Sequence, residues 1–304
     1  MYNEYNKSNS ILIAENDTNM NRQKITTKSL LDKRVNKTPI TMLTAYDYPT
    51  ARILDEVGID IILVGDSLGM TVLGYETTLP VTMDEMIHHC KAVSRGAKTP
   101  LLVGDMPFMS YQVSTEEGVR NAGKFLQNAG MDAVKLEGGR ERIATIRKII
   151  ESGIPVMGHI GLTPQSVHQL GGFRMQGKSA SAAYHLIQDA LELEKAGVFS
   201  LVLESIPDKL GALITEKLTI PTIGIGAGAG CSGQVLVIHD VLGVLDQFVP
   251  RFAKPYANLH QVMIEAITAY KDEVIRGDFP DPSHVFHISD QEWEKLIQHL
   301  DAIT

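Results

Sequence analysis

From about Pro39 onward, the chain alternates between short apolar runs and longer segments with an amphipathic helical period. An uninterrupted apolar run of roughly four to eight residues is typical of a strand that is buried on both faces. Runs of this kind predict seven strands, at residues 40–47, 60–67, 101–107, 133–139, 155–161, 200–205 and 221–228. An eighth strand is predicted in the stretch GVLDQFVPRFAK, at residues 243–254.

Between the apolar runs lie segments whose apolar residues recur at helical spacing. The clearest spans residues 114–130, where Ser114 and Glu117 form a capping-box pattern and a terminal glycine ends the helix. Residues 181–197 show the same pattern, and the stretches LDEVG and IIESG predict two further helix ends at glycine. Beyond the eighth strand, the sequence predicts one long helix at residues 259–277 and an irregular segment at 278–289.

This alternation predicts a parallel sheet covered by helices, and two architectures satisfy it. A doubly wound sheet has its binding site at one switch point, whereas a (β/α)8 barrel builds its site from the carboxyl ends of many strands. Polar residues end most of the predicted strands, namely Asp47, Asp66, Ser67, Asp105, Lys135, Glu137, His159, Glu204 and Ser205. The distribution favours an α/β fold of the (β/α)8 TIM-barrel type, formed as one catalytic domain by residues 24–304.

Composition and charge narrow the classes of protein that fit. With 44% hydrophobic residues, the 304-residue chain can bury a large core, which excludes a globally disordered protein. A net charge of −8 argues against nucleic acid or an anionic membrane as a partner. No apolar run approaches the roughly 18 residues of a membrane span. The two cysteines, Cys90 and Cys231, lack metal-ligand spacing, which is typical of a reducing compartment and predicts a cytoplasmic protein.

The first 23 residues are polar, rich in asparagine and poor in apolar residues. They lack the charged start and the long apolar stretch of a secretory signal, and their acidic residues argue against a transit peptide. We therefore expect a disordered tail over residues 1–23, and Met20 is an alternative start of translation.

Two aspartates end neighbouring predicted strands, Asp66 in GDS and Asp105 in GDMP. Adjacent parallel strands lie about 4.8 Å apart, so two carboxylates at matching heights could share one cation. A small number of oxygen ligands suits Mg²⁺, which keeps several waters and leaves room for a chelating substrate, and Mn²⁺ and Co²⁺ fit as well. The sequence lacks the Cys and His cluster of a zinc site. The alternative is that each aspartate caps a following turn or helix.

Four further ionisable residues admit both a functional and a structural interpretation. Lys135 and Glu137 are two positions apart and so point to one side of a strand, either as a substrate-binding cation beside an acid or as an internal salt bridge. His159 closes the run PVMGHIG as a structural or a functional histidine. Glu204 closes SLVLES, either as a helix cap or as a partly desolvated base.

The glycine-rich stretch after the seventh strand resembles an anion-binding loop of backbone N–H groups. It contains a formal GxGxxG at Gly228, Gly230 and Gly233, but no long amphipathic helix opens after it, which argues against a dinucleotide site. One divalent cation, a lysine, a histidine and a spare carboxylate suit the formation or breakage of a bond next to a carbonyl group. The cation and the lysine would hold a 2-oxo acid while the base removes a proton.

Several longer motifs resemble a known family. MLTAYDYPTA, the block from GIDIILVGDSLGM to MIHHCKAV, VKLEGG, GHIGLTPQS, LVLESIP, TIGIGAG and GQVLVIHD follow the pattern of the ketopantoate (3-methyl-2-oxobutanoate) hydroxymethyltransferases. The resemblance extends from about Pro39 to Phe286. It implies a barrel of the phosphoenolpyruvate/pyruvate type that transfers a one-carbon unit from 5,10-methylenetetrahydrofolate to 3-methyl-2-oxobutanoate. The implied product is 2-dehydropantoate, on the route to pantothenate and coenzyme A.

The resemblance also implies a role for each polar strand end. Asp66 and Asp105 match Mg²⁺ ligands, and Glu137 matches a residue of the metal's outer environment. The positions that match the oxo-acid site are Asp66, Ser67, Asp105, Lys135 and His159. Glu204 matches the base that would generate a Mg²⁺-stabilised enolate. The family resemblance further implies a large homo-oligomer, a decamer, with small-molecule substrates.

Two rival interpretations and two departures from the family pattern accompany the resemblance. A related barrel that cleaves or rearranges 2-oxo acids would carry the KKCGH-type loop of the lyases, which the sequence lacks. A non-catalytic barrel that only binds a metabolite would have no reason to keep every matched polar strand end together. The departures are Ser232, where the family commonly has Asp before Gly-Gln, and the extension before Met20.

Overall fold

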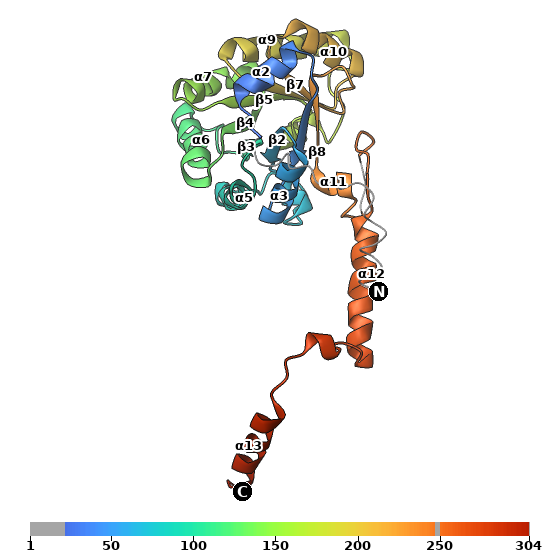
Figure 1. Cartoon of the computed structure of the whole chain (residues 1–304). Coiled ribbons are helices and arrows are strands. Elements are labelled where there is room, and N and C mark those ends of the chain that lie inside the picture. The colour runs from blue at the N-terminus through green and yellow to red at the C-terminus, as the bar shows by residue number, and fades with distance from the viewer. Residues whose placement is uncertain (1–21, 247–249, 304) are drawn as a thin grey trace. The chain divides into compact units, whose positions relative to one another are not determined.

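The computed structural model describes residues 22–246 and 250–303. Eight parallel strands close into a barrel in which each strand pairs with the next along the chain and β8 pairs with β1 (Figure 1). The strands are β1 (Ile40–Thr44), β2 (Ile61–Val64), β3 (Leu101–Asp105), β4 (Ala133–Glu137), β5 (Val156–Gly161), β6 (Ser200–Glu204), β7 (Thr222–Ile225) and β8 (Gly233–Leu236). The (β/α)8 fold predicted from the sequence is confirmed.

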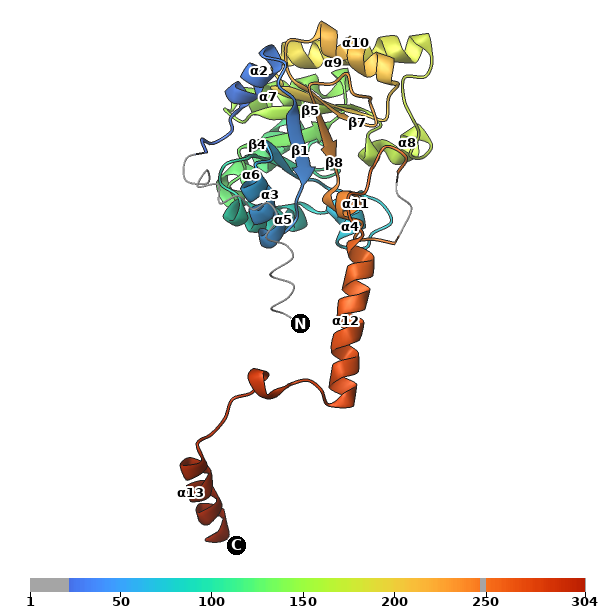
Figure 2. The same ribbon diagram turned by 45° about the vertical axis from the view of Figure 1, so that its right-hand side comes forward.

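Helices alternate with the strands and surround the barrel in both ribbon views (Figures 1 and 2). The helices of the barrel are α2 (Thr27–Val35), α3 (Tyr48–Val57), α4 (Leu68–Thr71), α5 (Met83–Gly96), α6 (Thr115–Ala129), α7 (Ile143–Glu151), α8 (Val167–Leu170), α9 (Ala180–Ala196), α10 (Asp208–Lys217) and α11 (Ile238–Leu242), with 3₁₀ turns η2 (Arg140–Arg142) and η3 (Pro164–Ser166). In Figure 2 the β1 arrow points away from α2 and toward α4, so the carboxyl ends of the strands lie on the side of α4.

The predicted helix boundaries are confirmed where capping chemistry marks them. The Ser114 hydroxyl accepts a hydrogen bond from the backbone N–H of Glu117 at the start of α6, which satisfies one of the free N–H groups there. At the carboxyl ends of α3, α6 and α9, a glycine adopts the left-handed conformation, at Gly58, Gly130 and Gly197 respectively. Side chains rarely adopt this conformation, so glycine is the residue that ends these helices.

Seven of the eight strand predictions are confirmed, and the eighth is wrong. The strand that closes the barrel is β8, at Gly233–Leu236, ten residues before the stretch predicted from the sequence began. Its residue Gln234 is exposed, so β8 is not covered on both faces, and the criterion of a continuous apolar run misses it. The outward residue Thr41 on the neighbouring β1 is exposed as well.

The barrel is filled by apolar side chains that alternate along the strands. The buried core cluster consists of Leu30, Ile40, Met42, Ile61, Leu63, Leu101, Val103, Ala133, Met157, Val202, Ile223 and Val235. Members on one strand are two positions apart, which is the spacing of side chains on one face of a strand. Because Leu30 of α2 belongs to the cluster, α2 packs over the amino-terminal end of the barrel and only the carboxyl end is left for a site.

The chain divides into two compact units, and the residues after the barrel form the second, at 242–246 and 256–303. This unit contains α12 (Leu259–Arg276), η4 (Pro282–His284) and α13 (Asp290–Asp301). The predicted long helix at 259–277 is confirmed, whereas α13 has no counterpart among the predicted elements. No helix in residues 22–246 or 250–303 has the length and apolar character to cross a membrane. The single domain over 24–304 stays a prediction, and the predicted tail lies outside the described residues up to residue 21.

Candidate active site

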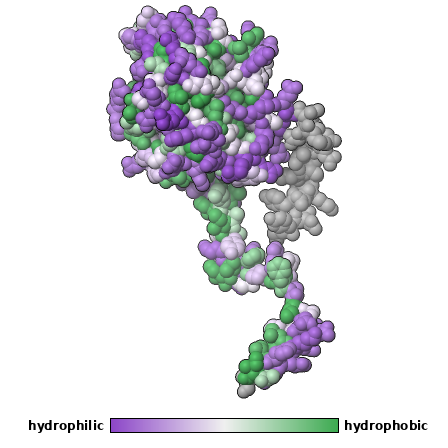
Figure 3. All heavy atoms as spheres, turned by 90° about the vertical axis from the view of Figure 1, so that its left-hand side faces the viewer, coloured by the Kyte–Doolittle hydropathy of each residue, from purple (hydrophilic) through white to green (hydrophobic). Residues whose placement is uncertain are grey.

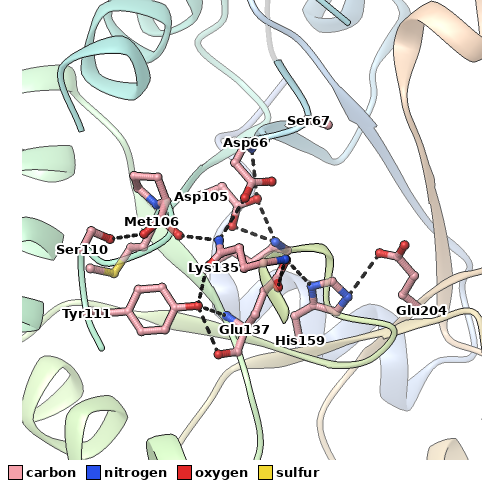
Figure 4. Close-up of polar contacts among 12 residues, drawn as sticks. Asp66, Ser67, Asp105, Met106, Ser110, Tyr111, Lys135, Glu137, His159 and Glu204 are labelled. Carbon is pink, nitrogen blue, oxygen red and sulfur yellow. Dashed lines mark hydrogen bonds and ion pairs between the residues drawn. The ribbon is translucent and has the colours of Figure 1, made fainter. Parts of the chain in front are cut away.

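The inward faces of four strands change from apolar to ionisable toward their carboxyl ends (Figure 4). The inward positions read Leu101, Val103 and Asp105 on β3, Ala133, Lys135 and Glu137 on β4, Met157 and His159 on β5, and Val202 and Glu204 on β6. The period of two therefore stacks these ionisable side chains directly above the apolar core. In a (β/α)8 barrel, this end of the strands is where active sites are built.

The strand register sets which of these side chains meet. Asp105 on β3 lies opposite Lys135 on β4, and Glu137 lies opposite His159 on β5. Lys135 Nζ donates to both carboxylate oxygens of Asp105, at 2.7 and 2.8 Å. The alternative of a Lys135–Glu137 salt bridge is therefore replaced by a Lys135–Asp105 pair, with both side chains buried.

Asp66 joins this cluster from the turn after β2. Its backbone N–H donates to Asp105 Oδ2 at 3.2 Å, so the two aspartates are neighbours, as the sequence predicts. Its carboxylate accepts a hydrogen bond from a glutamine side chain, not from the start of a helix, and Asp105 is held by a lysine, so neither has the role of a helix cap. Of the polar strand ends, Asp47 is the one that caps a helix, since its carboxylate accepts from the Thr50 N–H in α3.

Burial of several like charges shifts the ionisation of this cluster. Burial raises the pKa of Asp66 well above its usual range, and the nearby carboxylates of Asp105 and Glu137 raise it further. Burial also raises the pKa of Asp105, although the Lys135 ammonium opposes that shift. For Lys135, burial favours the neutral amine, but the surrounding carboxylates outweigh it and raise its pKa. Lys135 is consequently a permanent cation among carboxylates.

His159 lies between two carboxylates. Its Nδ1 is 3.5 Å from Glu137 Oε1, and its Nε2 is 3.2 Å from Glu204 Oε2 (Figure 4). Burial and the Lys135 charge lower the pKa of His159, but the two carboxylates outweigh them and raise it to about 9. The imidazole is therefore charged near neutral pH and links Glu204 to the rest of the cluster.

Glu204 differs from the other carboxylates in exposure and in its backbone. Its side chain is 15% exposed, whereas those of Glu137 and His159 are 3% and 2% exposed. The following residue, Ser205, has a positive φ of 48°, which is a sparsely populated conformation for a residue with a side chain. The chain thus turns sharply after Glu204, and α10 begins four residues later at Asp208 without using Glu204 as its cap.

Ser67 is half-buried at the start of α4, where its Oγ lies 2.8 Å from the hydroxyl of Tyr46. Burial raises the pKa of Tyr46 to about 12, so the phenol keeps its proton and can donate to Ser67. This arrangement leaves the Ser67 hydroxyl at the edge of the aspartate pair.

Two polar residues at the centre of the site received no role from the sequence. Gln165 in η3 donates through Nε2 to Asp66 Oδ2 at 2.9 Å, and Tyr111 donates through its hydroxyl to Gln165 Oε1 at 2.7 Å. Gln165 stands 99 positions after Asp66. Neither Gln165 nor Tyr111 lies at the end of a strand, so a search for polar residues at strand ends does not find them. The signal that could have found Gln165 is the motif GLTPQS, in which it is the only long polar side chain.

The glycine-rich loop after β7 is explained by packing. A Cβ atom at Gly228 would lie 2.6 Å from Asp208 Cβ, and one at Gly230 would lie 2.6 Å from Ala212 Cβ. The loop therefore lies directly against α10, which only glycine permits. Ser232 also has a structural role there, since its hydroxyl accepts from the Thr222 N–H of β7 at 3.2 Å.

Among the residues that the structure describes, no group of three or more His, Cys, Asp or Glu side chains is arranged to hold a metal ion. Asp66 and Asp105 are the neighbouring carboxylates that could contribute to a cation site, where Asp105 would be shared between the cation and Lys135. Glu137 Oε2 accepts a hydrogen bond from the Gln165 N–H at 3.0 Å, and its Oε1 faces His159. Two carboxylates with water and substrate are the type of ligand set that Mg²⁺ uses.

Known proteins resemble this chain over most of its length. Residues 24–282 match the family of ketopantoate hydroxymethyltransferases. The 3-methyl-2-oxobutanoate hydroxymethyltransferase of Syntrophus aciditrophicus is 58% identical over 264 residues, which cover 87% of this chain and 97% of that protein. The enzyme of the same name from Enterococcus faecalis is 55% identical over 273 residues, covering 90% and 99%.

Solved structures share the fold at low identity. A phosphonopyruvate hydrolase in complex with oxalate and Mg²⁺ aligns with a TM-score of 0.56 at 9% identity, covering 91% of this chain and 97% of that one. A 2,3-dimethylmalate lyase, described as a member of the PEP mutase/isocitrate lyase superfamily, aligns with a TM-score of 0.54 at 14% identity, covering 91% and 96%. At these identities the likeness shows the barrel alone.

Proposed function

Because this chain belongs to the ketopantoate hydroxymethyltransferase family, we propose that its reaction takes place in the cluster of ionisable side chains at the carboxyl end of the barrel. The reaction is transfer of a hydroxymethyl group to 3-methyl-2-oxobutanoate in pantothenate biosynthesis. The donor we propose is 5,10-methylenetetrahydrofolate. The observation that carries the proposal is that four buried ionisable groups, Asp66, Asp105, Lys135 and His159, lie beside one partly exposed carboxylate, Glu204.

The charge of the cluster fits a divalent cation. The buried carboxylates of Asp66, Asp105 and Glu137 face a single lysine and one histidine, and an excess of buried negative charge is costly unless a cation compensates it. We propose that Asp66 and Asp105 ligate Mg²⁺, with Glu137 in its outer environment. The oxalate–Mg²⁺ complex of phosphonopyruvate hydrolase supports this choice, since a barrel of the same fold binds that pair. Bound there, Mg²⁺ would polarise the 2-oxo group and so acidify the proton at C3 of the substrate.

The cations of the chain would bind the substrate's anionic end. Lys135 Nζ is held by Asp105 and cannot lose its charge near neutral pH, so it offers a fixed partner for the substrate's carboxylate. The charged His159 offers an N–H donor to a substrate oxygen, and the Ser67 hydroxyl offers a third contact. Because these groups are already oriented by buried neighbours, binding requires little reorganisation.

We propose that Glu204 is the base. Its carboxylate is oriented by His159 Nε2 at 3.2 Å, while its partial exposure leaves it accessible to the C3 proton of a bound substrate. Removal of that proton by Glu204 makes C3 a nucleophile, which then forms a C–C bond to the one-carbon unit of the donor. The bonds of that carbon to the folate nitrogens break, water supplies the hydroxyl group, and tetrahydrofolate is the leaving group. The rival interpretation as a lyase or mutase has the support of the fold alone, because the 2,3-dimethylmalate lyase and a phosphoenolpyruvate phosphomutase of the same fold are each 14% identical to this chain.

The test uses exchange of the C3 proton of 3-methyl-2-oxobutanoate in deuterated buffer, which needs no folate donor. Glu204→Gln should lower the exchange rate by about 10²-fold or more, because a positioned general base contributes roughly that much. Glu151→Gln, at an exposed position of α7, is the matched control and should exchange as the unsubstituted chain does. Exchange at an unchanged rate in a folded Glu204→Gln variant would overturn the assignment of the base.

We further propose a cytoplasmic homo-oligomer, which in this family would be a decamer. Support comes from α12, along which several apolar side chains are exposed, namely Val262, Met263, Ile264, Ile267, Tyr270, Val274 and Ile275. Apolar residues also gather on the helices of the second unit in the space-filling view, whereas the surface of the barrel unit is largely hydrophilic on the face shown (Figure 3). A contiguous apolar surface of this kind is typical of a protein–protein interface.

A further inference from the structure

Gln165 contacts two carboxylates of the proposed metal site, Asp66 and Glu137. We propose that Gln165, locked in place by Tyr111, is a positioning residue that holds the Asp66 carboxylate with one oxygen, Oδ1, presented to the cation. The inference rests on the proposed function, in that it requires Asp66 to be a metal ligand.

The orientation of the Gln165 side-chain amide is fixed by its four hydrogen bonds. Its Nε2 donates to Asp66 Oδ2 and to the Met106 carbonyl oxygen, both at 2.9 Å. Its Oε1 accepts from the Tyr111 hydroxyl at 2.7 Å and from Gln112 Nε2 at 3.2 Å. A side-chain amide has two N–H donors and two acceptor sites, so all of its capacity is used. A flipped amide would set its oxygen against a carboxylate and a carbonyl.

Tyr111 connects the Gln165 amide to strand β4. Its hydroxyl accepts from the backbone N–H of Glu137 at 3.1 Å, at the end of β4, and its ring is buried. The hydroxyl has one proton, and of the two acceptors within reach Gln165 Oε1 at 2.7 Å is closer than the Glu137 carbonyl oxygen at 3.2 Å. Because β4 is hydrogen-bonded to β3 on one side and to β5 on the other, Tyr111 holds the amide of Gln165 against a rigid part of the fold.

Gln165 also contacts both a proposed metal ligand, Asp66, and the residue proposed for the metal's outer environment, Glu137. Its backbone N–H donates to Glu137 Oε2 at 3.0 Å, while its side chain holds Asp66, so a single residue in η3 sets the positions of both carboxylates. Asp66 Oδ2 is thereby occupied, which leaves Oδ1 to face a cation. Outer residues that orient a metal ligand are worth about 10–100-fold in metal affinity.

The test measures binding of Mn²⁺ alone, by the electron paramagnetic resonance signal of the free ion, without substrate. Gln165→Met keeps the length of the side chain and removes its hydrogen bonds, and Tyr111→Phe removes one hydroxyl. Gln127→Met, on the exposed side of α6, is the matched control. Both test variants should weaken Mn²⁺ binding by about 10–100-fold, and the control should bind as the unsubstituted chain does.

A second readout separates positioning from catalysis and from folding. At saturating Mn²⁺, C3 proton exchange in both test variants should return toward the rate of the unsubstituted chain, because Glu204 is untouched. Unchanged Mn²⁺ affinity in the variant that retains its native circular dichroism spectrum would overturn the inference, and so would exchange that stays low at saturating metal. If the unsubstituted chain does not bind Mn²⁺, or if Asp66→Ala binds it as tightly as the unsubstituted chain does, the proposed metal site itself is wrong, and the inference falls with it.

Discussion

Replacing Lys135 by methionine should strongly destabilise the folded barrel, and this effect does not depend on the substrate. Lys135 Nζ lies 2.7 and 2.8 Å from the two oxygens of Asp105, and the two side chains are 5% and 2% exposed. The substitution keeps the length of the side chain and removes the charge. Asp105 then remains buried next to Asp66 and Glu137 with its cation gone.

The size of the effect follows from two estimates that agree. Removal of one partner from a buried ion pair costs about 3–5 kcal/mol. The cost is limited by protonation of the carboxylate that is left behind. For a carboxyl with an unperturbed pKa of about 3.9, at about pH 7 and about 1.36 kcal/mol per unit, this limit is about 4 kcal/mol. We therefore expect a loss of about 4 kcal/mol in the free energy of unfolding near neutral pH.

The loss should depend on pH in a defined direction. Burial already raises the pKa of Asp105 in the folded chain, and without Lys135 it rises further above the value in the unfolded chain. The folded variant then binds more protons than the unfolded one, so its stability falls as the pH rises above the unfolded pKa and recovers as the pH is lowered toward it. The deficit should shrink by about 1.4 kcal/mol for each pH unit below neutral.

The assay is urea-induced unfolding followed by far-ultraviolet circular dichroism, in the presence of EDTA, at several pH values. Lys195→Met is the matched control, because Lys195 Nζ also lies 2.7 Å from a carboxylate oxygen, in this case of exposed Glu192. Exposed pairs contribute little, so the control should unfold at the same urea concentration as the unsubstituted chain. A Lys135→Met variant as stable as the control, or one whose deficit does not change with pH, would refute the reasoning.

Two other predictions concern packing and assembly. Gly104→Ala should destabilise the barrel by about 1–3 kcal/mol, because a Cβ there would overlap the ring of Phe125 in α6. Thermal unfolding measures the difference from the control Gly123→Ala, whose added Cβ would meet no atom within 4 Å. The molecular mass of the unsubstituted chain measured by light scattering should be that of a decamer. Ile267→Lys, on the exposed side of α12, should reduce that mass. A monomeric unsubstituted chain would contradict the proposed assembly.

The barrel and most of its ionisable cluster could be predicted from the sequence because they depend on short-range periodicity. Strands buried on both faces are continuous apolar runs, and a polar residue two positions beyond an inward apolar one must face the same interior. This is why Lys135 and Glu137 could be assigned to one side of β4, and why Asp105 could be expected beside Asp66. The salt bridge expected as the structural alternative for Lys135 was with Glu137, whereas the strand register pairs Lys135 with Asp105.

What could not be predicted depends on long-range packing or on incomplete burial. β8 was missed because Gln234 is exposed and leaves only two apolar residues, Val235 and Leu236, at the end of the strand. Gln165 reaches Asp66 across 99 positions from a 3₁₀ turn, and no periodic pattern links them. Tyr111 likewise comes from a loop without regular structure, between β3 and α6.

The central claim is tested most directly by an assay of the full chain with 5,10-methylenetetrahydrofolate and 3-methyl-2-oxobutanoate, with EDTA and after addition of Mg²⁺. The account predicts that 2-dehydropantoate forms only when both substrates and the metal are present, that EDTA abolishes it, and that Mg²⁺ restores it. No 2-dehydropantoate with Mg²⁺, Mn²⁺ or Co²⁺ would contradict the assignment of the reaction. Full activity in EDTA would contradict the metal site at Asp66 and Asp105.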